Sequence, residues 1–599
     1  MITQTNKDDL VLGIDIGSSR SAVAYVDPVT KKIHDVGKSN KHQKSFESIA
    51  GFDEEGKIIT CKEAGAKRLN KNCMIFSNLK RALVENKRLD YNGVLHRPLY
   101  LLAQILKRLK SEAEKQIGYQ VKKAIVTVPA YFEEIHKAAI RKAASLAGLD
   151  VLKLINEPTA AVVTYCNTIK KASGSLLKEV VLILDAGGFT FDASLCQIDN
   201  TVIDVIATHG DYSAGNRLID QNIKALILEE YEKKFNLKPE LSHIDTINVD
   251  QISETIKIKA SANGNYSESQ SITIGSHSFD FKLSRTQLLA TYKPYLERLK
   301  RVITTILNKA HLKPNKILLV GGPANSKLFV SLLEDFLPYK IDLSLDPINS
   351  VARGAAIHGY ALTKGRGSSQ ILLDVLPISL GVEKLGLYCH KMLYKNSKIP
   401  CSHKETFSTY EDYQKKVKIK VLQGEDQMAE NCVELGTIVL DNIERAKKGI
   451  PKFVVNFEVN SSGLLTVTAE DQTTKDIKKL DLQCENRVSD AELEEMRSYA
   501  SNYEREDTSH MVKLQLVKDT QLTYVELCEL LTKIGNTSVG VVYANDLKNS
   551  KQVLDTELKR YPKDYPTLME LLRSARALIE EVTHALPEPS TDYLSLAAT

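Results

Sequence analysis

Two glycine-bearing turns, at residues 15–19 and 185–192, carry the residue types that bind phosphate and a hydrated metal ion. Backbone N–H groups and hydroxyls in such turns bind phosphate oxygens, and a neighbouring carboxylate suits hydrated Mg²⁺. Two such turns facing each other could hold a nucleoside triphosphate and Mg²⁺ from both sides. The residues concerned are Asp15, Gly17, Ser18 and Ser19 in the first turn, and Asp185, Gly187, Gly188, Thr190 and Asp192 in the second.

Taken alone, the first turn fits an ordinary turn at a strand end equally well. The chain contains no G-x-x-x-x-G-K-[ST] sequence, which excludes a P-loop. The function of the two turns must therefore be judged from the elements that position them.

Apolar strands lead into both turns and into a third glycine-bearing turn, at Leu10 to Ser19, Val180 to Asp192 and Ile317 to Pro323. Continuous apolar runs of this kind are typical of strands buried on both faces of a sheet. Helix-periodic stretches separate them, at Pro98 to Glu114 and Glu133 to Gly148. This alternation predicts an α/β domain.

The pattern changes after residue 360. Residues 364–369 are rich in glycine and serine, and a short apolar segment follows at residues 370–374. Alternating apolar and charged residues around Val417 to Val421 predict an antiparallel β domain. A capping box at Ser489 opens a segment that we expect to be helical almost to the end of the chain.

The composition is that of a soluble globular protein. Its 599 residues carry a net charge of only +5, which gives no reason to expect a nucleic-acid or membrane partner. Nine cysteines, an odd number with no C-x-x-C spacing, argue against a disulfide framework or zinc site and favour a reducing compartment. The sequence shows no secretion signal and no apolar run of the ~20 residues that a membrane helix needs. We therefore expect a cytoplasmic protein.

Longer motifs resemble the seventy-kilodalton heat-shock chaperone family. GIDIGSS, AIVTVPAYF, INEPTAA, LDAGGFTFD and LLVGG keep the family's order, and LLDVLPISLGVE, NSKIP, TFSTYED and VLQGE follow them. INEPTAA is highly specific, whereas GIDIGSS alone would also fit a sugar kinase or an actin-like filament protein. The β domain behind the LLDVLPISLG segment disfavours a metabolic kinase.

The resemblance implies a slow ATPase coupled to peptide binding. Its ligands would be ATP, Mg²⁺ held through water by Asp15 and Asp185, and K⁺, and its partners would be hydrophobic peptide segments of client proteins and a J-domain co-chaperone. The implied organisation is an α/β actin-like, two-lobed ATPase domain at 1–366, an interdomain linker at 367–374, a β-sandwich substrate-binding domain at 375–488 and an α-helical lid at 489–599.

The resemblance also assigns roles to individual residues. Lys80 would orient the attacking water and Glu157 would help to position it, with Asp185 and Thr190 completing the catalytic set. Such a set is sufficient because phosphoryl transfer needs positioning and charge neutralisation more than covalent help. The adenosine side would comprise Glu254, Lys257, Ser261, Gly321 and Gly322. Without the resemblance, Lys80, Glu254 and Lys257 would be ordinary surface residues.

Two further groups follow from the resemblance. The allosteric positions are Pro129, Lys137, Lys153, Leu372, Leu373 and Asp374. The positions lining the peptide channel are Val382, Leu385, Phe407, Tyr410, Val417 and Ile419. Any single apolar member of the second group also fits plain sandwich core.

The chain departs from the family pattern around the nucleotide. Phe189 stands in place of the third glycine of the second turn, where its side chain could crowd the phosphates. Ile258 and Asn325 replace two arginines that sandwich the adenine, which removes ~1–2 kcal/mol of binding. Lys137 and Lys153 replace arginines and lack their planar fork. We therefore expect weak ATP binding and slow hydrolysis, and the alternative is a peptide-binding module with a degenerate ATPase.

Three features are similar to the HscA-type branch, which serves iron–sulphur cluster assembly: a short lid, divergent nucleotide turns and bulky Tyr410 in the arch over the peptide. This branch recognises a Leu-Pro-Pro-Val-Lys segment on a scaffold protein. A general protein-folding chaperone remains the alternative.

Overall fold

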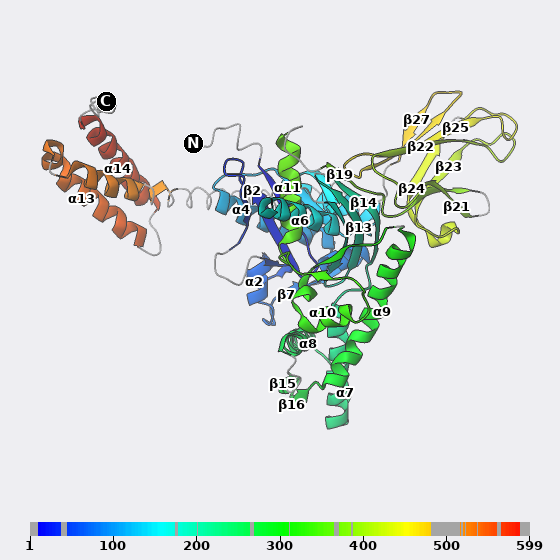
Figure 1. Cartoon of the computed structure of the whole chain (residues 1–599), viewed down its shortest axis with the longest axis horizontal. Helices are drawn as coiled ribbons and strands as arrows, with labels where there is room; N and C mark the ends of the chain where they lie inside the picture. Colours follow the sequence, from blue (N-terminus) through cyan, green and yellow to red (C-terminus); the bar gives the residue numbers. More distant parts are fainter. Residues whose placement is uncertain are drawn as a thin grey trace. The chain divides into compact units, whose positions relative to one another are not determined.

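The computed structural model describes residues 10–37, 45–173, 178–200, 202–263, 269–310, 312–364, 371–384, 387–441, 443–480, 516, 519–520, 523–535, 537–559 and 565–586. The chain forms two compact units, residues 1–488 and 489–599 (Figure 1). The capping box predicted at Ser489 lies outside the described residues. Within the described ranges, no helix is long and apolar enough to cross a bilayer.

Two mixed sheets with the same plan form the first two thirds of the larger unit. In each, an antiparallel three-strand meander is extended by parallel strands on the edge where the meander begins. The first sheet comprises β1 (Val11–Asp15), β2 (Arg20–Val26), β3 (Ile33–Asp35), β4 (Phe46–Glu47), β10 (Lys123–Val128) and β11 (Asp150–Asn156). The second comprises β12 (Lys178–Ala186), β13 (Phe191–Asp199), β14 (Val202–Asp211), β17 (Lys316–Val320), β18 (Ile341–Asp342) and β19 (Ile371–Leu373).

Helices surround each sheet, as the strand-helix alternation predicts. The first lobe is the first sheet with α3 (Leu79–Val84), α4 (Pro98–Ile117) and α5 (Glu134–Leu146). The second lobe is the second sheet with α7 (Arg217–Phe235), α8 (His243–Asn263), α9 (Arg285–Lys309), the short η1 (Gly322–Asn325) and α10 (Lys327–Glu334). Smaller elements are α2 (Cys61–Ala66), β5 (Ala50–Phe52), β6 (Ile58–Thr60), β7 (Met74–Phe76), the hairpin β8 (Leu89–Tyr91) and β9 (Val94–His96), and the hairpin β15 (Ser269–Ile274) and β16 (His277–Lys282).

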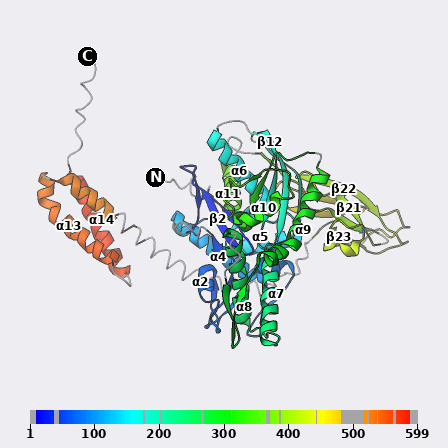
Figure 2. The same cartoon turned by 60° about the horizontal axis from the view of Figure 1, so that its bottom comes forward.

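The two lobes are joined by α6 (Glu157–Ser173) and α11 (Ser350–Lys364), which lie side by side in both views (Figures 1 and 2). One buried core contains strand residues from both sheets together with α6 side chains, including Ile125, Ile183 and Val162. Because this core is shared, the two sheets pack as one body.

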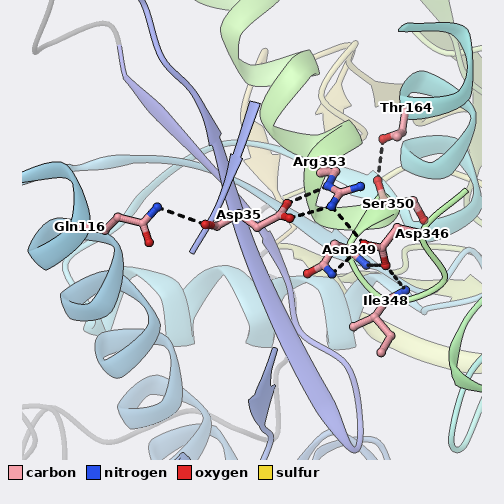
Figure 3. Close-up of polar contacts among 8 residues, drawn as sticks. All are labelled: Asp35, Gln116, Thr164, Asp346, Ile348, Asn349, Ser350 and Arg353. Carbon is pink, nitrogen blue, oxygen red and sulfur yellow. Dashed lines mark hydrogen bonds and ion pairs between the residues drawn. The ribbon is translucent and has the colours of Figure 1, made fainter. Parts of the chain in front are cut away.

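A polar cluster fixes the start of α11 (Figure 3). The Arg353 guanidinium donates to both carboxylate oxygens of Asp35 on β3, at 2.7 and 2.6 Å, and to Asp346 at 3.0 Å. Thr164 of α6 donates to the Ser350 carbonyl at 2.6 Å. The bidentate geometry is the stronger form of an arginine–carboxylate contact, so it ties the edge of the first sheet to the residues that precede α11.

The β domain predicted from the period-two alternation is present in the larger unit. Its two four-stranded antiparallel sheets enclose a core that includes Leu380, Val421 and Phe457. One sheet contains β20 (Leu380–Lys384), β21 (Tyr388–Leu393), β23 (Val417–Gln423) and β24 (Val433–Leu440). The other contains β22 (Cys401–Ser408), β25 (Lys452–Val459), β26 (Leu465–Asp471) and β27 (Ile477–Lys479).

The smaller unit is helical where it is described. Its two long helices, α13 (Ser538–Lys559) and α14 (Tyr565–Ala585), pack around a core that includes Leu547 and Ala575. Pro566 is the second residue of α14, a position in the first turn where proline is tolerated.

Gly354 allows α11 to approach α6 closely. A β-carbon on Gly354 would lie 1.8 Å from the carbonyl oxygen of Ala160, whereas a β-carbon on Gly322 would meet no atom within 4 Å. Gly354→Ala must therefore push the helices apart, and we expect it to lower the free energy of unfolding by about 1–3 kcal/mol. Urea unfolding followed by circular dichroism measures this, with Gly322→Ala as the control. Equal stability of the two variants would contradict the packing argument.

Candidate functional site

The two predicted phosphate turns lie against each other. The first begins at Asp15, the last residue of β1, and the second follows the end of β12. A β-carbon on Gly188 would lie 2.8 Å from the Ser19 hydroxyl oxygen, so the side chain of one turn meets the backbone of the other. The two turns therefore lie next to each other, and their role as a clamp for a nucleotide stays a prediction.

Lys80 and Glu157 form a buried ion pair beside the first turn. The Lys80 ammonium donates to Glu157 Oε1 at 2.7 Å and to the Ile16 carbonyl at 2.9 Å. Lys80 is 4% exposed and Glu157 7% exposed, so the surface-lysine interpretation is excluded by burial. Glu157 reaches this point because it is the first residue of α6, directly after β11.

Three aspartates accompany the ion pair and make the site strongly acidic. Asp15 accepts a hydrogen bond from Thr127 at 2.8 Å, and Asp185 pairs directly with Asp192 across the β12–β13 ladder. Burial, with the nearby Glu157 charge as the next contribution, raises the pKa of Asp15 to about 7 and that of Asp192 to about 8. The same two causes raise the pKa of Asp185 well above its usual range.

This acidic cluster fits a divalent cation. One lysine faces four carboxylates, and Asp192 Oδ2 is a buried oxygen with no hydrogen-bond partner among the described residues. Within the described ranges, no three Asp, Glu, His or Cys side chains are close enough to bind a metal directly. A cation that kept its own water ligands would not need direct contact with the carboxylates, and the water-mediated role of Asp15 and Asp185 stays a prediction.

The second turn is held by the segment at Gly210 to Asp220, which begins at the end of β14 and diverges from the pattern of the family that the sequence resembles. Gly187 N–H donates to the Thr190 carbonyl at 2.9 Å, and the Gly187 and Gly188 carbonyls accept from Asn216 and Arg217 at 3.0 and 2.9 Å. A β-carbon on Gly215 would lie 2.1 Å from Phe189 Cα, so only glycine permits this packing. The divergent segment is therefore the structural support of the turn.

Phe189 lies between two arginines. Its ring is 5.4 Å from the guanidinium carbon of Arg81 on α3 and 5.2 Å from that of Arg217 on α7, and the residue is 7% exposed. Both distances are within the range of cation–π attraction. From the sequence we expect Phe189 only to crowd the phosphates, and neither arginine is predicted to contact it, although Arg81 directly follows Lys80.

The predicted adenosine-side residues fall on α8 and at the start of η1. Lys257 is paired with Asp220 at 2.7 Å, and the Ser261 hydroxyl hydrogen bonds with that of Tyr292 at 2.9 Å, so both side chains are already partnered. Gly321 has φ +90°, and a β-carbon there would lie 2.1 Å from the Ala186 carbonyl oxygen, next to the second turn. The other residues on the predicted adenosine side are more accessible to solvent. Glu254 is partly buried, Ile258 is 57% exposed and Gly322 is exposed.

Three of the predicted allosteric positions line a pocket where the first sheet contacts the β domain. Lys137, Lys153, Asn156 and Asp374 line it. Lys137 donates to Glu134 at 2.8 Å, while Asn156 donates to Asp374 at 3.5 Å. Burial raises the pKa of Asp374 and lowers that of Lys153.

The linker positions and Pro129 lie beside this region. Leu372 and Leu373 belong to β19, which pairs in parallel with β14. Leu372 packs on the core shared by the lobes, and Leu373 is 40% exposed. Pro129 is buried and directly follows β10.

The predicted peptide-channel residues differ in burial. Val382 and Ile419 lie in the core of the β domain, and Phe407 and Val417 pack against it while partly exposed. Tyr410 is 53% exposed in the loop between β22 and β23. Leu385 lies outside the described residues. The plain-core alternative therefore fits Val382 and Ile419 best.

Comparisons with known proteins agree over nearly the whole chain. A family model described as Hsp70 protein matches residues 77–582. The Chaperone protein DnaK of Nitrosopumilus maritimus (strain SCM1) is 29% identical over 602 residues, covering 97% of this chain and 92% of the relative. The proteins of the same name from Mycoplasmopsis pulmonis (strain UAB CTIP) and Thermoplasma volcanium (strain ATCC 51530 / DSM 4299 / JCM 9571 / NBRC 15438 / GSS1) are each 31% identical. The alignments cover 88% of both chains for the former, and 98% of this chain and 95% of the relative for the latter.

Removing the lysine of the buried Lys80–Glu157 pair should lower the free energy of unfolding more than removing the lysine of a surface pair. Lys80→Ala leaves a buried carboxylate without its cation, so we expect a loss of about 3–5 kcal/mol in the free energy of unfolding. Lys416→Ala removes a largely solvated pair with Asp441 and should cost no more than ~1 kcal/mol. Chemical unfolding of both variants tests this.

The double variant Lys80→Ala, Glu157→Gln separates charge from packing. Because it leaves no unpaired buried carboxylate, it should recover part of the lost stability. If it is less stable than Lys80→Ala alone, burial of an unpaired charge is not the cause of the loss.

Proposed function

The chain belongs to the Hsp70 family, and from this premise we propose that it is an ATP-dependent molecular chaperone that binds short hydrophobic peptide segments. In this proposal residues 1–366 are an actin-like ATPase domain, and the β domain and terminal helices are its peptide-binding domain and lid. The observation that carries the proposal is the pair of adjacent turns around Lys80, Glu157 and the aspartates.

The residues of the site suit hydrolysis of a terminal phosphate. The Lys80 ammonium donates to Glu157 and to the Ile16 carbonyl, and its third proton can orient a water molecule. Mg²⁺, held through its waters by Asp15 and Asp185, would neutralise charge on the phosphates. Thr190 and the hydroxyls of the first turn would donate to phosphate oxygens. K⁺ remains a prediction from the family resemblance.

The contact between the first sheet and the β domain gives a route for coupling. Glu134 N–H at the start of α5 donates to the Gln423 side chain at 2.8 Å, and Arg141 donates to the Ser462 carbonyl at 3.3 Å. Lys137 and Lys153 lie beside Asp374 in the pocket between them. We propose that nucleotide state acts on this contact, and that clients and a J-domain co-chaperone act through it in a cytoplasmic setting.

We further propose that this chain accepts a narrower range of client peptides than a general protein-folding chaperone. Tyr410 presents an exposed aromatic ring in the loop expected to arch over the peptide, and a bulky arch admits fewer sequences than a small one. This favours the specialised iron–sulphur scaffold client over general protein folding. A passive peptide-binding module remains the second candidate, because Asn325 and Ile258 place no cation where adenine would stack.

Single-turnover ATP hydrolysis tests the proposal directly. We expect slow turnover by the purified protein, faster in the presence of a peptide containing Leu-Pro-Pro-Val-Lys, because peptide binding and hydrolysis are coupled through the interdomain contact. A scrambled peptide of the same composition is the control.

The outcomes separate the alternatives. Turnover with equal response to both peptides would support a general chaperone and overturn the specialised client. Peptide binding without any turnover would leave the passive module.

Replacing Asn325 should restore an adenine contact. Asn325 is exposed at the end of η1, so Asn325→Arg places a guanidinium there without disturbing the core. We expect ATP to bind roughly tenfold more tightly, corresponding to ~1–2 kcal/mol of cation–π and stacking energy. Calorimetric titration measures the affinity, and Asn549→Arg on α13 is the matched control. Unchanged affinity would contradict the adenine assignment.

A further inference from the structure

Two cysteines of the β domain lie around one lysine. Cys389 and Lys391 belong to β21, and Cys432 directly precedes β24. The Lys391 ammonium is 3.3 Å from the Cys389 sulfur and 3.9 Å from the Cys432 sulfur. Cys432 packs against the small cluster that contains Cys389, so both thiols lie beside the same ammonium.

The backbone holds the two thiols in this position. Cys389 N–H donates to the Gln427 carbonyl at 2.8 Å, and Ala429 N–H donates to the Leu387 carbonyl at 2.7 Å. The loop of residues 424–432 therefore lies along the start of β21. Lys391 also donates to the Gly424 and Asp426 carbonyls, which fixes its ammonium between the loop and the strand.

The two thiols differ in access to solvent. Cys432 is partly exposed, whereas Cys389 is 8% exposed. Cys166 and Cys196 are also neighbours, but they lie in the core shared by the lobes and are 3% and 0% exposed. Of these two pairs, the one in the β domain has a sulfur that a small reagent in solution can reach.

We propose that Cys389 and Cys432 form a reversible disulfide when a low-molecular-weight disulfide, such as oxidised glutathione, is supplied. The Cys432 thiolate attacks one sulfur of the reagent, forming a mixed disulfide and releasing one thiolate. The Cys389 sulfur then attacks Cys432, forming the internal disulfide and releasing the second thiolate. The two protons of the protein thiols pass to the released thiolates, so one disulfide is reduced as another forms.

The environment makes this oxidation slow at neutral pH. Burial, followed by the neighbouring Cys389 thiol, raises the pKa of Cys432 to about 11, with Asp426 acting in the same direction and the Lys391 ammonium opposing them. Only a small fraction of Cys432 is then the reactive thiolate. The disulfide would therefore form only under sustained oxidation, and in a reducing compartment both cysteines would remain thiols.

The position of the disulfide gives it a consequence for the β domain. It would fasten the loop of residues 424–432 to β21. This loop begins next to Gln423, whose side chain accepts from Glu134 of α5, and it contains Glu425, which accepts from Ser379 at 2.8 Å. Oxidation would therefore restrain the segment through which the β domain contacts the first lobe.

The test uses the full-length protein, oxidised glutathione at pH 8 and alkylation of the remaining thiols. Intact mass should show a loss of about 2 Da before alkylation, and peptide mapping should show Cys389 linked to Cys432, with both changes reversed by dithiothreitol. A protein that keeps both thiols free, or that carries only mixed disulfides, would overturn the proposal.

Variants assign the two roles. Cys389→Ser should trap glutathione on Cys432, because no second thiol remains to release it, whereas Cys432→Ser should leave Cys389 largely unmodified. Cys401→Ser, in which the thiol lies on β22, is the control and should form the linked peptide as the unaltered chain does. Loss of the link in Cys401→Ser would overturn the pairing. If a variant does not fold, peptide mapping of the unaltered chain still decides.

Discussion

The site depends on one electrostatic constraint: three buried carboxylates and the partly buried Asp15 share a single buried lysine. Burying carboxylates without an equal number of cations is strongly unfavourable, and the raised pKa values of Asp15, Asp185 and Asp192 express that cost. A folded protein can maintain such a cluster when a ligand supplies positive charge. In the proposed function, the same feature that costs stability would favour binding of a divalent cation carried by a triphosphate.

The architecture places these groups by bringing distant strand ends together. Asp15 ends β1, Asp185 lies at the end of β12, and Glu157 follows β11 at the start of α6. The shared core and the close approach of α11 to α6 at Gly354 fix the position of one sheet relative to the other. The glycine at this crossing and the Arg353 cluster are thus part of the site's geometry, although they touch none of its reactive groups.

Local signals predicted the strands and both turns, because apolar runs that end in glycine and aspartate depend only on neighbouring residues. The Lys80–Glu157 pair spans 77 positions, and only the family resemblance identified it. The arginines around Phe189 were missed because cation–π contacts leave no periodic pattern. The sequence could not decide whether Val382 and Ile419 line a peptide channel or belong to the core. An apolar residue in a strand gives the same sequence pattern in both cases.

Phe189 places two arginines near the predicted phosphate turn, where they could contribute to nucleotide binding. Two arginines are absent at the predicted adenine end, whereas Arg81 and Arg217 contact the Phe189 ring in the second turn. Arg81 comes from α3 of the first lobe and Arg217 from α7 of the second, so the ring links the two lobes. Guanidinium groups suit phosphate oxygens, and here their positions depend on the relative placement of the lobes. In the proposed function, nucleotide binding would depend more on contacts to the phosphates and on the relative position of the lobes. It would depend less on the adenine base than in a chain that has the two stacking arginines.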